Sequence, residues 1–354
     1  MYYNIFMSKV KNTLFSNKPV TIDNNSLIMA IESSCDETAC AIVKGGREVI
    51  SNVVASQIKI HEEYGGVIPE IAAREHLEAI NIVIDEAFKQ AGVGVNERDK
   101  ISAFAGTVGP GLVGCLLVGL NAAKTLALAY DKPFIGINHL NAHLAANFID
   151  TDLEPPFIAL LVSGGHTQII KVNSYSDMQI IGETIDDAVG EAYDKVARLI
   201  GLPYPGGPKL DKLAQEGNPF AFKLPEAKVG EYDFSFSGLK TASLRLVKSF
   251  TDKNLPLPLN DICASFQECV SSTLYKKVKH ALEETGFNQV VLAGGVAANS
   301  EIRKKIFSLS DLGYDVYAPA MKYCTDNASM VASAAYFFEN TFDNIDVEVF
   351  SRVK

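Results

Sequence analysis

The amino-acid sequence predicts an α/β protein made of two related lobes, and three observations support this fold class. The chain has 354 residues, which exceeds the usual size of one hydrophobic core, and 47% of them are hydrophobic. An apolar run, a small polar turn and a second apolar run begin near residue 27 and recur near residue 157. Between them, segment 150–156 (DTDLEPP) breaks the apolar pattern with charge and proline. We therefore expect lobes at 27–150 and 151–340, a disordered leader at 1–26 and a tail at 341–354.

In the first lobe, apolar runs at 27–32, 39–43 and 49–56 predict three strands. A polar turn, SSCDET, separates the first two runs. An apolar periodicity over 70–91 predicts a helix. The segment 112–130 is rich in Gly, Ala and Leu, and we expect a helix there that packs closely at the lobe interface or against a partner.

The second lobe repeats this order. We expect strands at 157–162, 169–172, 178–181 and 290–292, and helices at 188–200, 239–250, 262–284 and from about Asn299 onward. A loop rich in Gly and Pro at 202–208 and an irregular stretch at 219–238 separate some of these elements.

The leader and the cysteines bear on the cell compartment. Residues 1–26 lack the continuous apolar segment of a secretory signal, so we expect a disordered leader, with organelle targeting as the alternative. The six cysteines form no CxxC pair and favour a reducing interior. No stretch of 18 uninterrupted apolar residues occurs, so we expect no membrane span and a cytoplasmic location.

Three turns rich in Gly or Ser each follow an apolar run, at 33–38, 163–167 and 294–299. Backbone N–H groups at such turns can bind phosphate oxygens, and glycine lets a ligand approach the backbone closely. Taken singly, each turn also fits an ordinary tight turn. None has the spelling of a P-loop or of a Rossmann dinucleotide motif.

His139 and His143 are four residues apart, which places both imidazoles on one face if the segment is helical. Such a pair can share a metal ion, and Asp326, at the start of another helical pattern, can add a carboxylate ligand. Two core or capping histidines are the alternative interpretation. A zinc protease would need Glu directly after the first histidine, and Leu140 stands there instead.

With these segments assembled, the chain closely resembles the TsaD family of tRNA adenosine threonylcarbamoyltransferases over about 27–338. Nine motifs carry the resemblance: IESSCDETA (31–39), HEEYGGVIPEIAAREH (61–76), GPGLVG (109–114), NHLNAHLAA (138–146), LVSGGHT (161–167), GEAYDKVARLIGLPYPGGP (190–208), FSFSGLKTA (234–242), AGGVAAN (293–299) and CTDNA (324–328). The resemblance implies the fold of actin, sugar kinases and chaperone ATPases, with two duplicated lobes around a nucleotide cleft.

The resemblance also implies an activity and a set of site residues. The activity is transfer of a threonylcarbamoyl group from threonylcarbamoyl-AMP to the N6 amine of the adenosine beside the tRNA anticodon, position 37, in tRNAs that read codons beginning with A. His139, His143 and Asp326 would bind one metal ion, Fe²⁺ first and Zn²⁺ as the alternative. The substrate-binding positions would be Leu161, Val162, Ser163, Gly164, Gly165, His166, Asp194, Gly207, Asp211 and Asn299. The implied partners are tRNA, a TsaB-like paralogue, a TsaE-like ATPase and an upstream enzyme that makes the donor.

The reaction needs a group that orients the acceptor amine or accepts its proton. Asp36 and Glu37 lie in the first polar turn and are our catalytic candidates; a turn-stabilising role for Asp36 is the alternative. Cys35 is disfavoured as a nucleophile because no histidine is near it in sequence and the chemistry needs no covalent intermediate. Asp186 and Asp187 occupy a place like that of a sugar-kinase base, or they cap the helix that follows.

Three other functions remain open at this point. A small-molecule kinase or chaperone-type ATPase of the same fold would share the nucleotide turns, but such relatives hold Mg²⁺ through carboxylates and phosphates. A non-enzymatic scaffold would tolerate loss of site residues, and all of them are present. A metalloprotease is weakened by Leu140.

The charge distribution bears on tRNA binding. The net charge of −10 argues against a protein that binds nucleic acid over its whole surface, because phosphate binding depends on Lys and Arg. Residues 235–310, however, hold ten Lys or Arg against six Asp or Glu, a local balance of +4. This segment predicts a modest tRNA-facing patch that includes Lys276, Lys277 and Lys279, although a solvated helix face is the alternative.

Overall fold

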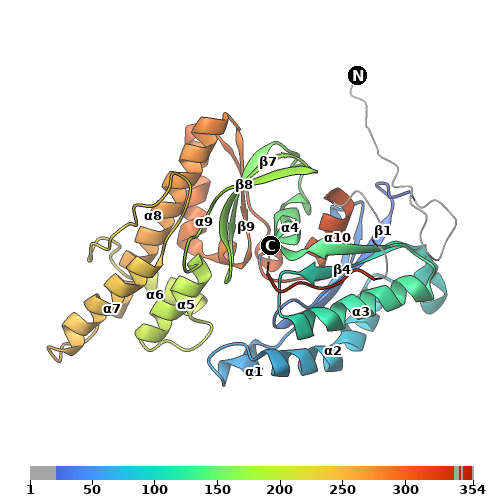
Figure 1. Cartoon of the computed structure of the whole chain (residues 1–354), viewed down its shortest axis with the longest axis horizontal. Coiled ribbons are helices and arrows are strands. Elements are labelled where there is room, and N and C mark those ends of the chain that lie inside the picture. Colours follow the sequence, from blue (N-terminus) through green and yellow to red (C-terminus); the bar gives the residue numbers. More distant parts are fainter. Residues whose placement is uncertain (1–20, 339–342, 344–345, 353–354) are drawn as a thin grey trace. The chain divides into compact units, whose positions relative to one another are not determined.

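A computed structural model describes residues 21–338, 343 and 346–352 of the chain (Figure 1). The chain forms two compact units. The first comprises the chain up to Leu153 together with the segment from Asp326 onward, and the second is Glu154–Thr325. Each unit contains one five-stranded sheet.

The first unit holds β1 (Leu27–Glu32), β2 (Glu37–Lys44), β3 (Glu48–Ser56), β4 (Ile101–Gly109) and β5 (Phe134–Asn138), in the order β3-β2-β1-β4-β5. β1, β2 and β3 pair antiparallel through short turns, whereas β4 and β5 continue the sheet parallel to β1. Parallel neighbours require long crossovers. Helices supply them: α2 (Pro69–Gln90) precedes β4, and α3 (Val113–Ala129) precedes β5.

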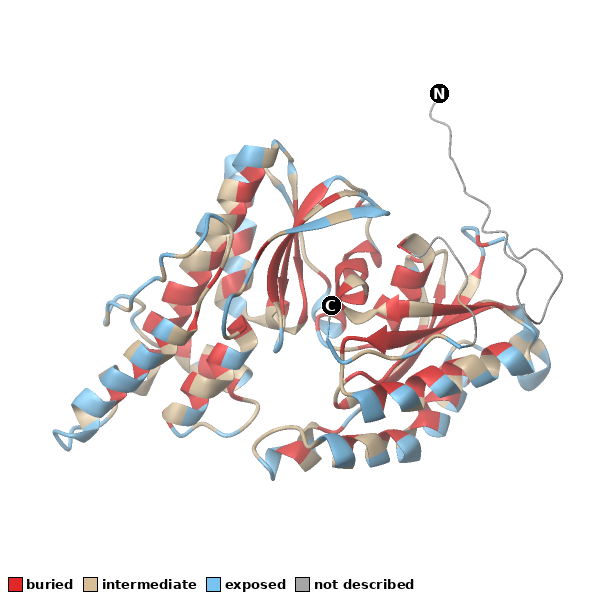
Figure 2. Ribbon diagram, viewed as in Figure 1, coloured by how far each residue is buried: buried red, intermediate tan, exposed pale blue. Residues whose placement is uncertain are grey.

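The remaining elements of the first unit complete its core. They are α1 (Ile58–Glu62), η1 (Val95–Lys100), α4 (His139–Ala145), η2 (Ala146–Phe148) and α10 (Ala328–Phe337). α2 and α3 contact the sheet, as do α4 and α10, and α4 packs against α10 (Figure 1). Figure 2 shows that β1 and β4 are buried along nearly their whole length, which explains why β1 reads as an apolar run and why β4 consists of apolar and small residues.

The second unit repeats this topology. Its strands are β6 (Phe157–Val162), β7 (Thr167–Ser174), β8 (Asp177–Glu183), β9 (Gln289–Ala293) and β10 (Asp315–Tyr317), in the order β10-β9-β6-β7-β8. The antiparallel trio β6, β7 and β8 corresponds to β1, β2 and β3, and β9 and β10 join parallel. The repeated strand order confirms the two related lobes that the sequence predicts.

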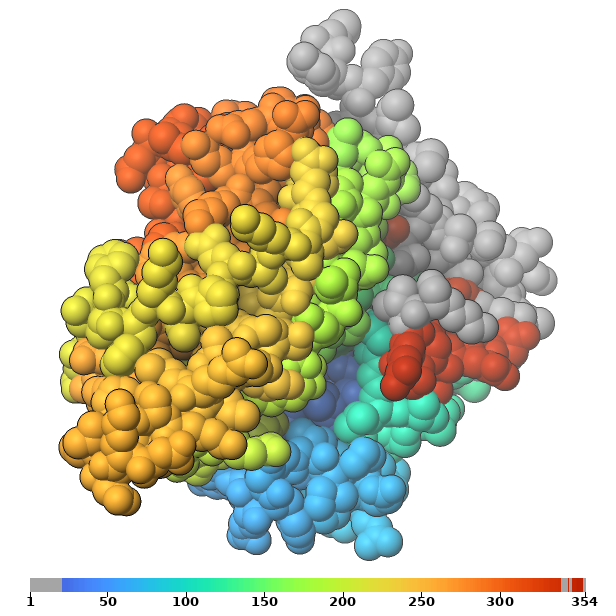
Figure 3. All heavy atoms as spheres, turned by 60° about the vertical axis from the view of Figure 1, so that its left-hand side comes forward, coloured from blue at the N-terminus to red at the C-terminus, as the bar shows by residue number. Residues whose placement is uncertain are grey.

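Helices of the second unit pack around one hydrophobic core. They are α5 (Val189–Leu199), α6 (Gly206–Ala214), α7 (Ser237–Thr251), α8 (Leu259–Thr285) and α9 (Ser300–Phe307), with short helices η3 (Gly295–Ala298), η4 (Ser308–Leu312) and η5 (Met321–Tyr323). The irregular segment between α6 and α7, drawn in yellow, lies at the surface (Figure 3).

The structure differs from the sequence-based division at the C-terminal end. We expected the second lobe to extend to residue 340, but the chain from Asp326 onward belongs to the first unit. The physical reason is the packing of α10, whose Ala328 joins Ala39 and Ala41 of β2 in a buried cluster. Part of the expected tail is also packed: Phe350 N donates to Val108 O at 2.9 Å.

Three strands, β4, β5 and β10, were not among the predicted elements, and most of the expected leader lies outside the described residues. All six cysteines are free thiols. Within the described ranges, no helix combines the length and the apolar character needed to cross a membrane.

Candidate metal centre and nucleotide pocket

The first unit brings His139, His143 and Asp326 together. The Nε2 atoms of His139 and His143 lie 3.7 and 3.3 Å from the same oxygen, Oδ1 of Asp326. The two imidazole rings are 4.6 Å apart between centroids, and one ligand atom from each of the three residues lies within 4.8 Å of the others. This spacing is small enough for all three to bind one ion.

Local structure explains the convergence. The side chain of Asn138 accepts hydrogen bonds from Leu140 N and Asn141 N, so it caps α4 and starts the helix at His139. The i, i+4 pair therefore lies on one face, as the spacing predicts. Asp326 immediately precedes the residue that caps α10, Asn327, whose side chain accepts from Met330 N.

A fourth residue, Glu32, orients His139, and sequence reasoning missed it. Glu32 is fully buried at the end of β1, and its Oε2 lies 3.3 Å from His139 Nδ1. Ser34 N and Thr107 Oγ1 also donate to the Glu32 carboxylate, which keeps it in place. A carboxylate on Nδ1 directs Nε2 toward Asp326, where a bound ion would take the place of the Nε2 proton; this is the usual arrangement behind a metal-bound histidine. The available signal was a single acidic residue at the end of an otherwise apolar strand.

The electrostatics fit a cation site. Burial alone would raise the pKa of Asp326, but the neighbouring His139 and His143 outweigh burial and lower that pKa to about 2. For His139, burial acts to lower the pKa, whereas Asp326 and Glu32 raise it to about 9. His143 Nδ1 is buried and has no hydrogen-bond partner in the described part of the chain. Two imidazoles and a carboxylate are a donor set that suits Fe²⁺ or Zn²⁺ and leaves coordination positions open.

The turn between β1 and β2 carries the catalytic candidates. Asp36 is nearly buried. Burial raises the pKa of Glu37 to about 10, and the charges of Asp326 and Asp36 add to this effect. A protonated Glu37 donates a hydrogen bond and does not accept a proton, so Asp36 is the better candidate for proton acceptor. Burial, with the charge of Asp36, also raises the pKa of the Cys35 thiol far above its usual range, which disfavours a thiolate nucleophile.

Side chains from α2 hold this turn. His76, which is fully buried, places Nδ1 2.7 Å from Thr38 Oγ1 and Nε2 3.0 Å from Cys35 O. Backbone contacts add to this: Gln57 N donates to Asp36 O at 3.0 Å. The carboxylates of the turn are therefore held on a fixed backbone.

The second unit contains a cavity of about 370 Å³, a volume typical of small-molecule sites. Five of the ten expected substrate-binding residues line it: Gly164, Asp194, Gly207, Asp211 and Asn299. The lining also includes residues that sequence reasoning did not name, among them Tyr193, Val296 and Met321. The residues that line the cavity come from α5, α6, η5 and the turns before α6, after β6 and after β9.

The turn after β6 offers backbone donors. Ser163 N donates to His166 O, and His166 N donates to Ser163 Oγ, which closes the turn internally. The backbone N–H groups of Gly164 and Gly165 donate to no acceptor within the described chain, and both residues are exposed. A Cβ built on either glycine would meet nothing within 4 Å. These two N–H groups are therefore accessible to a phosphate.

The polar residues of the pocket are also structural. Asp194 Oδ1 accepts from Gly206 N and Gly207 N at 2.9 and 3.1 Å and so caps the first turn of α6. Asn299 caps α9 by accepting from Ile302 N. Asp211 accepts from Ser300 N and Ser300 Oγ.

The other expected residues lie differently. Leu161 and Val162 are fully buried in β6, so their side chains face the core and only their backbone is available to a ligand. Ser163, Gly165 and His166 belong to the turn but are not among the residues that line the cavity.

Asp186 and Asp187 have structural partners that the sequence did not reveal. Asp186 accepts from Phe236 N at 2.8 Å and Ser237 Oγ at 2.8 Å, so it caps α7 and not α5, the helix that follows it in sequence. Asp187 forms ion pairs with Lys195 and Lys240.

The expected tRNA-facing lysines are also partly paired. Lys276 pairs with Glu226, and Lys279 pairs with Glu283. Lys277 Nζ donates to Gly230 O and Glu231 O. The positive potential of this surface is therefore weaker than the count of charges indicates.

Comparison with solved structures defines the class of protein. Full-length HypF in the phosphate- and nucleotide-bound form aligns with a TM-score of 0.60 at 17% identity, covering 90% of this chain and 47% of that chain. HypF of T. kodakarensis aligns with a TM-score of 0.59 at 15% identity, over 89% of this chain and 48% of that one. Together with the repeated strand order, these likenesses establish an α/β protein of the actin-like ATPase fold.

Sequence comparison then gives the family. The sequence model of the protein family "TsaD: tRNA N6-adenosine threonylcarbamoyltransferase" matches residues 48–333, and the chain belongs to this family. A curated protein of that name from Clostridium perfringens (strain SM101 / Type A) is 52% identical over 89% of this chain and 93% of its own length. One from Picosynechococcus sp. is 50% identical over 93% of this chain and 94% of its own length. The resemblance read from the motifs is thereby confirmed.

Proposed function

We propose that this chain transfers a threonylcarbamoyl group from threonylcarbamoyl-AMP to the N6 amine of adenosine 37 in tRNAs that read codons beginning with A. The observation that carries this proposal is membership of the TsaD family. The chain is 50–52% identical to two transferases of that family and covers more than nine tenths of their length. A small-molecule kinase or ATPase is not favoured, because His139, His143 and Asp326 are unlike the oxygen-rich ligand set of Mg²⁺.

The pocket of the second unit suits the AMP part of the donor. Gly164, which lines the cavity, offers its backbone N–H group to the phosphate, while Asp211 and Asn299 supply polar groups for the nucleoside. The transfer forms a bond between N6 and the carbamoyl carbon and breaks the bond from that carbon to the phosphate oxygen. AMP leaves with the electron pair, and donors at the phosphate stabilise its charge.

The acceptor amine loses one proton during this step. Its lone pair is delocalised into the purine ring, so a positioned base contributes to the rate. We assign this role to Asp36, since burial raises the pKa of the neighbouring Glu37 and so disfavours Glu37 as the proton acceptor. Both carboxyls are positioned by the backbone contacts of the turn.

The residues of the metal centre would hold one divalent ion, with Fe²⁺ as our first choice and Zn²⁺ as the alternative. When bound, the ion acts as a Lewis acid on donor oxygens. Glu32 fixes His139 so that its Nε2 is available to the ion.

For the partners we propose tRNA, a TsaB-like paralogue, a TsaE-like ATPase and an upstream enzyme that makes the donor. For the compartment we propose the cytoplasm, because six free thiols fit a reducing interior.

The decisive experiment combines activity with metal content. The purified chain is incubated with these partners, tRNA, threonine, bicarbonate and ATP, and the modified adenosine is measured by mass spectrometry. In parallel, Fe²⁺ or Zn²⁺ binding is measured by elemental analysis and thermal shift on the chain alone. We expect His143→Ala and Asp326→Asn to lose both metal binding and activity.

His280→Ala is the matched control, because His280 also contacts a carboxylate, Glu231, at 2.7 Å but belongs to the second unit and is not part of the candidate ligand set. It should retain metal content. Full metal binding by Asp326→Asn would contradict the metal assignment, and wild-type chain that leaves tRNA unmodified under these conditions would contradict the function.

A further inference from the structure

We propose that Gln267, which no motif of the sequence singled out, is a positioning residue that sets the hydrogen-bonding capacity of Asp211 in the nucleotide pocket. The inference deepens the proposed function and rests on it, since it takes the ligand to be a nucleoside monophosphate ester. Gln267 lies on α8 and is only 3% exposed.

The amide of Gln267 joins two pocket residues. Its Nε2 donates to Asp211 Oδ1 at 2.9 Å, and its Oε1 accepts from Asn299 Nδ2 at 2.9 Å. Tyr193, which also lines the pocket, donates its hydroxyl to the same Oε1 at 3.4 Å. The amide offers a donor on Nε2 and an acceptor on Oε1 without charge, so one side chain holds both partners.

The acceptor sites on Asp211 can be counted. An ionised carboxylate has about four lone-pair sites. Gln267 Nε2 and Ser300 Oγ occupy Oδ1, and Ser300 N occupies one site on Oδ2. Among the described residues, one site on Oδ2 is therefore left, and Asp211 lines the cavity. That remaining site can accept a hydrogen bond from a ligand O–H or N–H.

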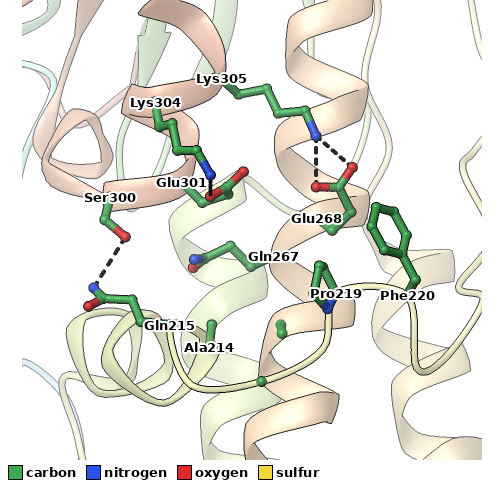
Figure 4. Close-up of a pocket in the computed structure, with 12 residues that line it drawn as sticks. Ala214, Gln215, Pro219, Phe220, Gln267, Glu268, Ser300, Glu301, Lys304 and Lys305 are labelled. Carbon is green, nitrogen blue, oxygen red and sulfur yellow. Dashed lines mark hydrogen bonds and ion pairs between the residues drawn. The ribbon is translucent and has the colours of Figure 1, made fainter.

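Gln267 and Ser300 thus hold the Asp211 carboxylate in place through hydrogen bonds to both of its oxygens. In Figure 4 the Gln267 side chain extends from α8 toward Ser300 and Gln215, and Gln215 Nε2 donates to Ser300 Oγ at 3.3 Å. A second cavity, of about 550 Å³, is lined by Gln267 and Ser300. The wall of the nucleotide pocket is therefore a hydrogen-bonded layer with a hollow beside it, and without Gln267 the carboxylate could turn.

This geometry predicts a specificity effect. A fixed acceptor discriminates between ligands with and without the matching donor, because a ligand that lacks the donor covers the remaining acceptor site of Asp211 without pairing it. A hydrogen bond to a charged group contributes about 1.5–3 kcal/mol, which corresponds to roughly 10- to 150-fold in affinity. If Asp211 is free to rotate, this discrimination shrinks.

The test measures binding to the full chain by calorimetry, with AMP, 2′-deoxy-AMP, 3′-deoxy-AMP and purine riboside monophosphate as probes. These analogues each lack one donor of the nucleoside. We expect wild type to bind one analogue at least about tenfold more weakly than AMP. Gln267→Leu should reduce that ratio by about tenfold, chiefly by weakening AMP.

Two further variants keep the inference falsifiable if Gln267→Leu folds poorly. Ser300→Ala removes the other hydrogen bond to Oδ1 at an exposed position, and we expect the same change in the ratio, to a smaller extent. Ser271→Ala is the matched control, because Ser271 is fully buried on the same helix but its Oγ donates to Glu268 O. Its ratio should equal that of wild type.

The outcomes distinguish the positioning role of Gln267 from the assignment of the pocket as a nucleotide site. If wild type discriminates among the probes and both Gln267→Leu and Ser300→Ala preserve the ratio, the positioning role is wrong while the pocket assignment stands. Equal weakening of all four probes by Gln267→Leu, with Ser300→Ala unchanged, would indicate general damage and would also overturn the positioning role. A wild-type chain that binds none of them would overturn the pocket assignment and this inference together.

Discussion

The contact between His76 and Thr38 predicts a measurable coupling between α2 and the catalytic turn. Cys35 O can only accept, so His76 Nε2 carries the proton, and Nδ1 accepts from the Thr38 hydroxyl at 2.7 Å. Burial lowers the pKa of His76, which agrees with a neutral ring. All three groups are thus matched as donor and acceptor.

The magnitude follows from what each substitution leaves unpaired. His76→Leu strands the Thr38 hydroxyl and Cys35 O, and each buried unpaired group costs about 1–3 kcal/mol, about 2–6 kcal/mol in all. Thr38→Val strands only His76 Nδ1, at about 1–3 kcal/mol. In the His76→Leu background the imidazole is already gone, so Thr38→Val removes the hydroxyl left unpaired and the double variant keeps only Cys35 O unpaired, at about 1–3 kcal/mol. The double variant should therefore be less destabilised than the sum of the two single variants by about 2–6 kcal/mol.

The assay is urea denaturation followed by circular dichroism, with hydrogen exchange of the β2 amides to report on the first unit. Activity provides a second readout: His76→Leu should lower kcat, while AMP binding by the second unit stays as in wild type. Free energies that add to within about 0.5 kcal/mol in the double variant would refute the pairing. Weakened AMP binding in His76→Leu would refute the separation of the two effects.

Three further predictions concern other parts of the chain. Gly190→Ala should weaken AMP binding by about tenfold in calorimetry, because the new Cβ would lie 2.8 Å from Gly164 Cα and disturb the phosphate turn; a Gly238→Ala variant, whose Cβ meets nothing within 4 Å, should bind normally. Asp186→Ala should destabilise the second unit by about 1 kcal/mol at pH 7 through loss of the α7 cap. Burial acts to raise the pKa of Asp186, but hydrogen bonds from Ser235, Phe236 and Ser237 outweigh burial and lower it, so the stabilisation is full above the unfolded-state pKa of about 4 and declines as pH falls through the lower folded-state pKa; melting curves should show a larger gap between wild type and variant at pH 7 than at pH 3. Combined Gln substitution of Lys276, Lys277 and Lys279 should lower tRNA affinity only a few-fold in low-salt filter binding, since these lysines already have partners, and a loss above a hundredfold would contradict that assessment.

Local patterns in the sequence were sufficient to predict much of the fold. The apolar runs at 27–32 and 157–162 coincide with β1 and β6, and the four-residue spacing of His139 and His143 placed both on one helical face. These features depend on periodicities that lie within one element. The family motifs added the site residues that lie on turns, such as Gly164 and Asn299.

The remaining features depend on contacts between distant segments. Glu32 and Gln267 act through partners far away in sequence, and nothing in their own neighbourhood shows what they touch. Asp186 was read as a cap for the next helix because proximity in sequence is the available guide, but the loop before α7 folds back onto it. The place of Asp326 in the first unit depends on the path of the whole chain.

That path has a consequence for how the protein matures. The two histidines are synthesised before the second unit, and Asp326 follows it, together with the helix that packs beside α4. A nascent chain that has not yet passed α10 therefore offers an ion only two imidazoles. If the proposed metal centre binds an ion, its three ligands are complete only late in biosynthesis, and a chain truncated anywhere within the second unit lacks Asp326.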